Sequence, residues 1–386
     1  MLPTAALADD KPSSKGKLSA GEGTEWGDKK SDRVAQDAYG RNEAQKDAGS
    51  LFTVTSVTGA REAWKAKDDR GRAVTGRGVT VTVLDSGVAA VPGLDAPGKI
   101  LRGPDLSFEA DSARPLSPDT YGHGTHMAGI IAAADPVKRD KKTGMPDAED
   151  ADDQLGMAPD ARLLALKLAT TDGSTDVSQV IAGLDWVVQH RNDNGMNVRV
   201  VNLSCGTTSV QPYQVDPLAA AAENAWRHGI VVVVSAGNGG EDHTLEGGSP
   251  AYEITNPAID PYVLAVGAAD GGTDVKGWDH PKVASFSSRG TASRPVDLMG
   301  PGRSIVGLRA PGSSVDLEHP EGRVRGDLSG RLFRGSGTSQ AAAVVSGAAA
   351  LLLQAHPKLT PDAVKAALVS TAHGSKNLDP LEAGAG

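Results

Sequence analysis

Short runs of consecutive apolar residues alternate with helical patterns from residue 79 onward. The runs are rich in valine and apolar at neighbouring positions, which is typical of strands buried on both faces of a sheet. They cover 79–84, 162–168, 198–203, 230–235 and 263–268. Helical patterns cover 123–133, 177–191, 216–228 and 339–355, and the helix-start signal Thr360-Pro361-Asp362 predicts a last helix. This alternation predicts an α/β fold with a doubly wound, mostly parallel sheet.

Polar residues follow three of the predicted strands. Asp85 and Ser204 come directly after their strands, and Asn238 comes shortly after a third. In doubly wound sheets, ligands bind outside the carboxyl ends of the strands. We therefore expect a functional site to include these three residues.

The first fifty residues differ in composition from the remainder. Residues 9–50 are dense in Asp, Lys, Glu, Gly and Ser and have almost no apolar periodicity, which predicts a poorly ordered extension outside the core. Ala6-Leu7-Ala8 resembles the small residues before a signal-peptide cleavage point, although the basic and apolar regions that should precede them are missing. We interpret 1–8 as the remnant of a secretory signal, with chance resemblance as the alternative, and 51–386 as the folded domain.

Composition excludes several classes of function. The 386 residues include 48 acidic and 39 basic ones, giving a formal charge of −9 and a pI of about 5.5. The chain therefore lacks the basic character of a protein that binds nucleic acid or anionic membranes. A single cysteine excludes an intramolecular disulfide and a cysteine-built zinc site. The uncharged stretch 335–355 is long enough to span a membrane, but its Gly, Ser, Thr and Gln residues favour a buried core helix.

Three short motifs contain candidate catalytic residues. Asp85 ends a strand in the motif DSG, His123 opens a helix in HGT, and Ser339 opens the long apolar helix in GTS. Each alone has an ordinary explanation, as a turn residue, a satisfied polar group or a loop. Their order along the chain is that of the subtilisin version of the Ser-His-Asp triad. A serine hydroxyl needs a neighbouring base to become a nucleophile, and the base needs a carboxylate to orient it.

The chain resembles subtilisin-like serine peptidases over residues 55–385. The motifs that carry the resemblance are VLDSG at 83–87, GHGTHMAG at 122–129, GMAP at 156–159, SAGN at 235–238 and GTS at 337–339. The segments DGS at 172–174 and GLDW at 183–186 look like the family's substrate-edge loop and its following helix. The resemblance implies a three-layer fold and a secreted, monomeric serine endopeptidase that acts through an acyl-enzyme intermediate. It also implies Asp85, His123 and Ser339 as the triad, with Asn238 as oxyanion donor.

The resemblance further implies where an extended polypeptide substrate would bind. It would pair as an added strand with the edges 173–175 and 202–206, and 235–237 would form one wall of the pocket for the residue before the cleaved bond. The residues expected at these edges and in this wall are Gly173, Ser174, Ser204, Cys205, Gly206, Ser235, Ala236 and Gly237. We interpret Cys205 itself as a buried small hydrophobe.

Several departures from the family pattern bear on this prediction. After the nucleophile the family usually has Met, a small residue and a Pro-His pair, whereas this chain has QAAAVVSG at 340–347. The missing proline predicts a more regular helix, and Gln340 brings an extra amide close to Ser339. The chain stops at 386, where relatives continue into another helix, so we interpret the domain as truncated at its C-terminus.

A polar insertion at 135–155 replaces the calcium loop that many relatives carry. Its acid-rich part, 147–153, lacks the spacing of a known calcium loop and is more typical of a solvated insertion. A structural calcium ion is therefore not supported by a matching loop, and any metal site is unknown. The triad chemistry itself requires no cofactor.

Two other functions fit the same sequence. The altered residues after Ser339 are compatible with a catalytically silent subtilisin-like binding module, and the unusual insertion is compatible with a dedicated processing protease. Covalent labelling of Ser339 by a fluorophosphonate would separate an enzyme from a module. Cleavage of a peptide library would separate a broad peptidase from a dedicated one.

Overall fold

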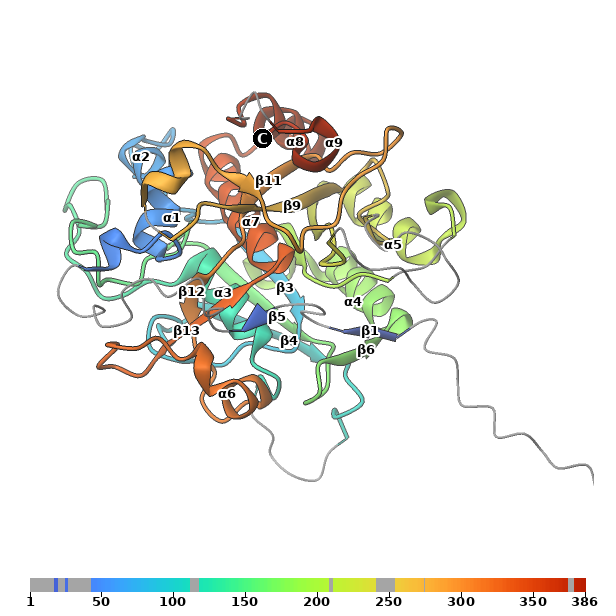
Figure 1. Cartoon of the computed structure of the whole chain (residues 1–386), viewed down its shortest axis with the longest axis horizontal. Coiled ribbons are helices and arrows are strands. Elements are labelled where there is room, and N and C mark those ends of the chain that lie inside the picture. Colours follow the sequence, from blue (N-terminus) through green and yellow to red (C-terminus); the bar gives the residue numbers. More distant parts are fainter. Residues whose placement is uncertain are drawn as a thin grey trace, which may run out of the picture.

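A mostly parallel sheet forms the centre of the molecule (Figure 1). The computed structural model describes residues 17–19, 25–26, 43–111, 118–207, 211–240, 254–273, 275–373 and 378–386. In spatial order the strands are β10 (Lys282–Val283), β9 (Leu264–Asp270), β8 (Val231–Ser235), β7 (Val198–Leu203), β3 (Thr80–Asp85), β5 (Arg162–Lys167) and β4 (Ile100–Asp105), and β11 (Leu298–Pro301) also pairs with β9. Only β10 is antiparallel to its neighbour among these pairs. The predicted α/β class is confirmed.

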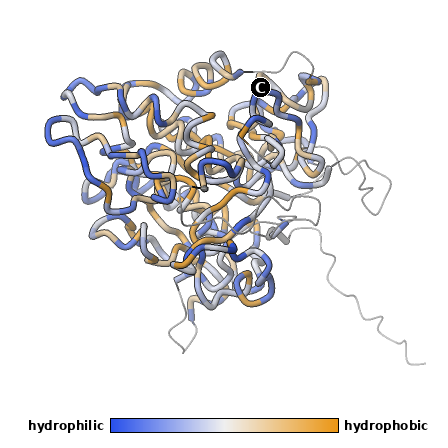
Figure 2. Tube along the Cα trace, turned by 60° about the vertical axis from the view of Figure 1, so that its left-hand side comes forward, coloured by the Kyte–Doolittle hydropathy of each residue, from blue (hydrophilic) through white to orange (hydrophobic). Residues whose placement is uncertain are grey.

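The central strands are buried on both faces. Every residue of β3 and β8 is buried, and the valines 231–234 have no exposed surface. Burying one such side chain stabilises the fold by about 1.5–3 kcal/mol. Figure 2 shows apolar segments running through the interior and hydrophilic segments on outer loops. A strand covered on both sides requires an uninterrupted apolar run. This pattern is why the sequence predicts five of the strands, which are β3, β5, β7, β8 and β9.

Two pairs of long helices cover the sheet (Figure 1). The helices are α1 (Leu51–Val57), α2 (Ala60–Lys65), α3 (His123–Ala132), α4 (Val177–His190), α5 (Pro217–Arg227), α6 (Ser314–Glu318), α7 (Thr338–Ala355), α8 (Pro361–Ser370) and α9 (Pro380–Ala383). Short 3-10 turns are η2 (Glu43–Lys46), η3 (Asp193–Gly195), η4 (Tyr213–Val215), η5 (Val275–Asp279) and η6 (Pro320–Gly322). Helix α3 packs against α7, and α4 packs against α5. All five predicted helices are present.

Local capping explains where several helices begin. Asp176 caps α4 and forms a capping box with Gln179, and Asp216 accepts hydrogen bonds from the first turn of α5. Thr360 caps α8, and Pro361 occupies the first helical position. These side chains satisfy backbone N–H groups that a helix start leaves unpaired. The helix starts are therefore readable from sequence.

Helix α7 is a core helix in this fold. Among the described residues it alone has the length and apolar composition of a membrane span, yet 83% of it is buried inside the protein. It packs on β7, β8 and β9 and carries Ser339 in its first turn.

The structure corrects the expectation for part of the N-terminal extension. Strand β1 (Lys17–Ser19) pairs with β6 (Ser174–Asp176), and β2 (Glu25–Trp26) joins a small sheet with β13 (Leu332–Ser336) and β12 (Ile305–Leu308). Residues 43–50 are packed, because Ala44 and Ala48 are buried and Asp47 pairs with Arg334. The remainder of 9–50, and the signal interpretation of 1–8, lie outside the described residues.

Strand β4 is an element that the apolar pattern does not predict. It is the last strand at one edge of the central sheet, and it is only partly buried. It also contains Gly103 and Pro104, and proline is tolerated on edge strands because one side of the backbone needs no ladder partner.

Candidate active site

Asp85 and His123 meet at the carboxyl end of the sheet. Asp85 is the last residue of β3, and His123 is the first residue of α3. His123 Nδ1 lies 2.9 Å and 2.8 Å from the two carboxylate oxygens of Asp85, and both side chains are fully buried. When Nδ1–H donates to the carboxylate, Nε2 becomes the proton acceptor of the ring. Within the described residues, His123 Nε2 has no hydrogen-bond partner.

A second buried carboxylate fixes the start of α3. Asp119 Oδ1 accepts from Gly122 N at 2.7 Å, and Oδ2 accepts from Thr125 N at 2.8 Å. Ser86 Oγ donates to Asp119 Oδ1 at 2.8 Å. Burial raises the pKa of Asp119, and the hydrogen bonds from Thr125 and Gly122 oppose this rise. Sequence reasoning missed Asp119, although an aspartate shortly before a helix is a capping signal.

The start of α3 also lies very close to the loop after β3. Gly124 N donates to Ser86 Oγ at 3.0 Å. A Cβ at Gly124 would lie 2.0 Å from the carbonyl oxygen of Gly87, so any other residue would push the helix away. The glycine after His123 therefore allows the imidazole to reach Asp85.

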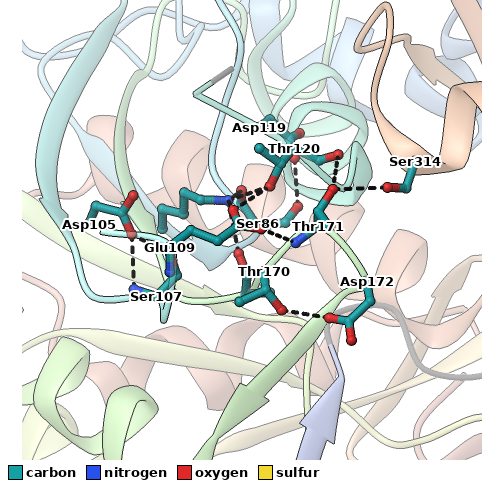
Figure 3. Close-up of polar contacts among 12 residues, drawn as sticks. Ser86, Asp105, Ser107, Glu109, Asp119, Thr120, Thr170, Thr171, Asp172 and Ser314 are labelled. Atoms are coloured by element: carbon teal, nitrogen blue, oxygen red, sulfur yellow. Dashed lines mark hydrogen bonds and ion pairs between the residues drawn. The ribbon is translucent and has the colours of Figure 1, made fainter. Parts of the chain in front are cut away.

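A buried ion pair supports the turn after Asp85. Lys167 ends β5 opposite Asp85, and its Nζ donates to Ser86 O at 3.2 Å and to Thr120 Oγ1 at 2.7 Å. The same Nζ lies 3.1 Å from Glu109, which in turn accepts from Thr171 N at 2.6 Å (Figure 3). These contacts connect the turn after Asp85 to the loop that precedes β6. No sequence pattern identifies Lys167 or Glu109 as part of the site.

Ser339 lies at the same end of the sheet as Asp85. It is the second residue of α7, and its Oγ lies 3.5 Å from the carbonyl oxygen of Ser204. Ser204 follows β7, which pairs with β3 up to Leu84. Ser339 Oγ makes this contact rather than a hydrogen bond to His123, whose Nε2 is unpaired within the described part of the chain.

A hydrogen-bond chain anchors α7 on β7 near this serine. Ser346 Oγ donates to Asn202 Oδ1 at 2.9 Å, and Asn202 Nδ2 donates to Ser204 Oγ at 2.8 Å. All three side chains are buried. Because buried hydrogen-bonded groups allow little adjustment, the helix is held in one register against the strand.

Thr338 orients the side chain of Asn238. The amide oxygen Oδ1 of Asn238 accepts from Thr338 N at 2.8 Å and from Thr338 Oγ1 at 3.0 Å. Because Oδ1 is committed to Thr338, Nδ2 is the donor end of the side chain. Thr338 immediately precedes Ser339, so Asn238 is brought next to the predicted nucleophile.

The predicted substrate-edge residues belong to β6 and β8, precede β6, or follow β7 and β8. Ser174 belongs to β6 and pairs with Ser19 of β1, and Gly173 precedes it. Ser235 ends β8, Ala236 is fully buried, and Gly237 N donates to Thr338 Oγ1 at 3.2 Å. Ser204, Cys205 and Gly206 follow β7.

Cys205 is buried, with 5% of its surface exposed. Burial raises the pKa of the Cys205 thiol, and the negative charge of Asp85 adds to the effect. A thiol in this environment is unreactive, which agrees with its interpretation as a small hydrophobe.

Trp26, Tyr121 and His126 complete the surroundings of His123. The Trp26 ring lies edge-on to His123 and His126, with centroids 6.0 Å and 5.4 Å apart. The Trp26 side chain hydrogen-bonds to Tyr121, whose ring packs against Gly173. Burial, with a contribution from His123, lowers the pKa of His126 to about 3, so this ring is neutral. A tryptophan within a polar extension is the signal that sequence reasoning passed over.

Acidic side chains of the insertion 135–155 take part in local contacts. Asp135 pairs with Arg331, and Asp140 accepts hydrogen bonds from Lys142 and Thr143. Among the residues that the structure describes, no group of three or more His, Cys, Asp or Glu side chains is placed to hold a metal ion.

Comparisons with known proteins identify the family of the chain. The chain is 34% identical to serine protease AprX of Bacillus subtilis (strain 168), covering 87% of this chain and 70% of that protein. It is 32% identical to subtilisin DY of Bacillus licheniformis, covering 80% and 88%. A solved structure of a cold adapted subtilisin-like serine proteinase superposes with a TM-score of 0.57 at 25% identity, covering 87% of this chain and 96% of that one.

The family model described as the subtilase family matches residues 76–386, which include every residue predicted for the triad and the substrate edges. The chain therefore belongs to the subtilase family of serine endopeptidases.

Proposed function

We propose that Ser339, His123 and Asp85 form the catalytic triad of this serine endopeptidase. The observation that carries the proposal is the buried pair of Asp85 and His123, with both carboxylate oxygens within 2.9 Å of Nδ1. This pairing selects the tautomer in which Nε2 can accept a proton. Ser339 comes from a different element and lies at the same end of the sheet.

The proposed reaction follows from these positions. Rotation of Ser339 about χ1 exchanges its contact with Ser204 O for one with His123 Nε2, a hydrogen bond that often forms only when substrate is bound. Nε2 takes the hydroxyl proton while Oγ attacks the carbonyl carbon. The protonated imidazole then gives this proton to the leaving amine nitrogen, which yields the acyl-enzyme. A water molecule, deprotonated by the same nitrogen, attacks the ester carbon; the bond between this carbon and Ser339 Oγ breaks, and the imidazole returns the proton to Oγ.

Two donors would stabilise the tetrahedral oxyanion. Nδ2 of Asn238 is one, and its orientation by Thr338 supports this role. The backbone N–H of Ser339 is the other, because it lies in the first turn of α7, where helix N–H groups point outward and the helix dipole is positive. Preorganised donors of this kind usually provide the largest single contribution to such catalysis.

An extended polypeptide is the proposed substrate. The pairing of β1 with β6 shows that the edge at Ser174–Asp176 accepts an antiparallel strand. The same edge, with residues 204–206 opposite, would hold substrate through backbone hydrogen bonds, which read main chain more than sequence. The 235–237 wall would then bound the pocket for the residue before the cleaved bond.

Labelling and mutation test this assignment. A fluorophosphonate should label Ser339 in the wild-type chain and fail to label Ser339→Ala. Because triad members act as a unit, the double variant Ser339→Ala, His123→Ala should be scarcely less active than either single variant. Multiplicative losses in the double variant would contradict the triad, and absent labelling of a folded wild-type chain would favour the silent binding module.

Three further properties are part of the proposal. The chemistry uses no metal or cofactor, because the three side chains supply the nucleophile, the base and its orienter. The enzyme acts as a monomer outside the cell, as the family resemblance implies. Sedimentation of the purified chain and detection of the product of the full gene in culture medium would test these points.

A further inference from the structure

Glu109 contacts three separate parts of the proposed site (Figure 3). Its Oε1 accepts a hydrogen bond from Thr171 N at 2.6 Å, and its Oε2 accepts one from Thr120 Oγ1 at 2.9 Å. Oε2 also lies 3.1 Å from Lys167 Nζ. Thr171 belongs to the loop before β6, Thr120 comes shortly before α3, and Lys167 ends β5. One carboxylate therefore joins a loop, a helix start and a strand end.

The buried cation of Lys167 requires an anion at this place. Its Nζ donates to the carbonyl oxygens of Ser86 and Ala169 at 3.2 Å and 2.9 Å, and to Thr120 Oγ1 at 2.7 Å. These oxygens carry only partial charges, whereas a buried cation needs a paired anion to offset its lost hydration. Glu109 provides that anion, and the two side chains are only 8% and 15% exposed.

The loop before β6 is closed on itself. Thr170 N donates to Ser174 O at 2.9 Å, and Gly173 N donates to Thr170 O at 2.9 Å. These two bonds fix the shape of the loop, but they do not attach it to another element. The bond from Thr171 N to Glu109 does attach it, because Glu109 lies in the segment that follows β4.

The loop runs directly into the edge that we propose for substrate. Ser174, where one of the closing bonds ends, is the first residue of β6. The loop and the first residue of β6 are therefore one hydrogen-bonded unit, and a displacement of Thr171 displaces the edge.

The turn after Asp85 has support of its own. Ser86 Oγ donates to Asp119 Oδ1 at 2.8 Å and accepts from Gly124 N at 3.0 Å. These bonds do not involve Glu109. Loss of the Glu109 carboxylate should therefore move the substrate edge while Asp85 stays in place.

We propose that Glu109 is a positioning residue for substrate, which holds the β6 edge at a fixed place relative to Asp85 and His123. The residue before the cleaved bond enters the pocket at 235–237, and the residues that precede it pair with β6. Glu109 thus determines how well the enzyme binds the residues that lie further from the cleaved bond. This inference rests on the proposed function, because it assumes that substrate pairs with β6.

Kinetics with substrates of two lengths test this role. One substrate is the p-nitroanilide of a four-residue peptide, and the other is the p-nitroanilide of its last residue alone. Glu109→Ala should lower kcat/KM for the four-residue substrate about tenfold, mostly through KM; tenfold corresponds to about 1.4 kcal/mol. The single-residue substrate does not reach β6 and should change by less than about twofold. Glu109→Gln keeps an acceptor for Thr171 N and should lie between Glu109→Ala and wild type.

Strand β1 pairs with the same edge and would compete with substrate. All compared chains therefore carry Leu18→Pro and Ser19→Pro. Adjacent N–H groups of a strand point in opposite directions, so two consecutive prolines remove the donor that faces β6.

Two further variants control for folding and for loss of charge. Glu223→Ala is the matched control, because the Glu223 side chain is 14% exposed and pairs with Arg227 within α5. It should leave both substrates unaffected. Glu109→Ala combined with Lys167→Met avoids an unpaired buried cation and should show the same dependence on substrate length as Glu109→Ala. Melting temperatures establish that each variant is folded.

A binding measurement makes the test independent of catalysis. In chains that also carry Ser339→Ala, a fluorescein-labelled four-residue peptide should bind about tenfold more weakly after Glu109→Ala. Equal affinities, or equal kinetic losses for the long and the short substrate, would overturn the positioning role. Weakened binding by Glu109→Ala, with no fluorophosphonate labelling of a folded chain that retains Ser339, would support this role and overturn the catalytic assignment.

Discussion

The hydroxyl of Ser86 lies 2.8 Å from Oδ1 of Asp119 (Figure 3) and 3.2 Å from Oδ1 of Asp85. One serine thus connects the carboxylate proposed for the triad with a second buried carboxylate. Asp119 in turn holds the first turn of α3, where His123 begins the helix. The position of the imidazole is therefore determined by Asp119 as well as by Asp85.

Asp119→Ala should lower both stability and turnover. It leaves the buried N–H groups of Gly122 and Thr125 without their acceptor, at a cost of about 1–3 kcal/mol for each unpaired group. The loosened helix start displaces His123, so kcat should fall while KM stays near its wild-type value. Asp119→Asn keeps one acceptor oxygen and should be intermediate in both properties. A lowered melting temperature with unchanged kcat, measured well below that temperature, would limit Asp119 to a structural role.

Asn238→Ala should lower kcat and leave KM nearly unchanged, because an oxyanion donor bonds more strongly to the tetrahedral intermediate than to the substrate carbonyl. We expect a loss of roughly 10² to 10³ in kcat, a magnitude taken over from the oxyanion-hole asparagine of subtilisin. Thr338→Val removes one of the two bonds that orient Asn238 and should cause a smaller loss, whereas Thr338→Ser retains the hydroxyl. Unaltered kcat with a reduced melting temperature would remove Asn238 from the site.

Cys205 should resist alkylation in the native protein. Burial raises the pKa of its thiol, and the charge of Asp85 adds to this, so the reactive thiolate is scarce at neutral pH. Once a bulky reagent is attached, the enzyme should lose substrate binding rather than chemistry, because Cys205 follows Ser204 on the proposed substrate edge. Cys205→Ala provides the control, since no other cysteine is present. Normal peptide hydrolysis after complete modification would show that this edge does not contact substrate.

Lys99 should make stability depend on pH in the alkaline range. Its Nζ is buried and donates to the carbonyl oxygens of Pro159 and Ala161 at 2.6 Å and 3.0 Å. Burial lowers the pKa of Lys99 from 10.5 to about 7. Between these two pKa values the unfolded chain binds more protons than the folded one, so the free energy of unfolding rises with pH. The cost of burying Lys99 is absent above pH 10.5 and grows as the pH falls to about 7.

The comparison with Lys99→Met isolates this contribution. The difference in unfolding free energy between wild type and variant should change with pH by at most about 1.4 kcal/mol per unit, with wild type gaining as the pH rises. Methionine leaves two carbonyl groups without a donor, so the slope rather than the absolute difference is diagnostic. Denaturant unfolding at intervals between pH 7 and 10 measures it, and parallel curves would contradict a perturbed Lys99.

The sequence by itself determined the features that depend on local pattern. The valine run of β8 predicts a buried strand because both of its faces need apolar side chains, and Thr360 predicts the start of α8 because it caps unpaired N–H groups. The motifs also placed Asp85 at a strand end and His123 at a helix start, which the structure confirms. Family membership followed from the same motifs.

Only the tertiary structure decided which side chains meet. Trp26 lies against His123 because β2 pairs with β13 from the opposite end of the chain, and backbone pairing leaves no apolar periodicity in the sequence of the segment. The contacts of Asp119 with Ser86, and of Ser339 with Ser204, likewise join different elements. Such contacts depend on how parallel strands and their loops converge at one end of a sheet, and sequence spacing does not encode the distance between atoms on separate elements.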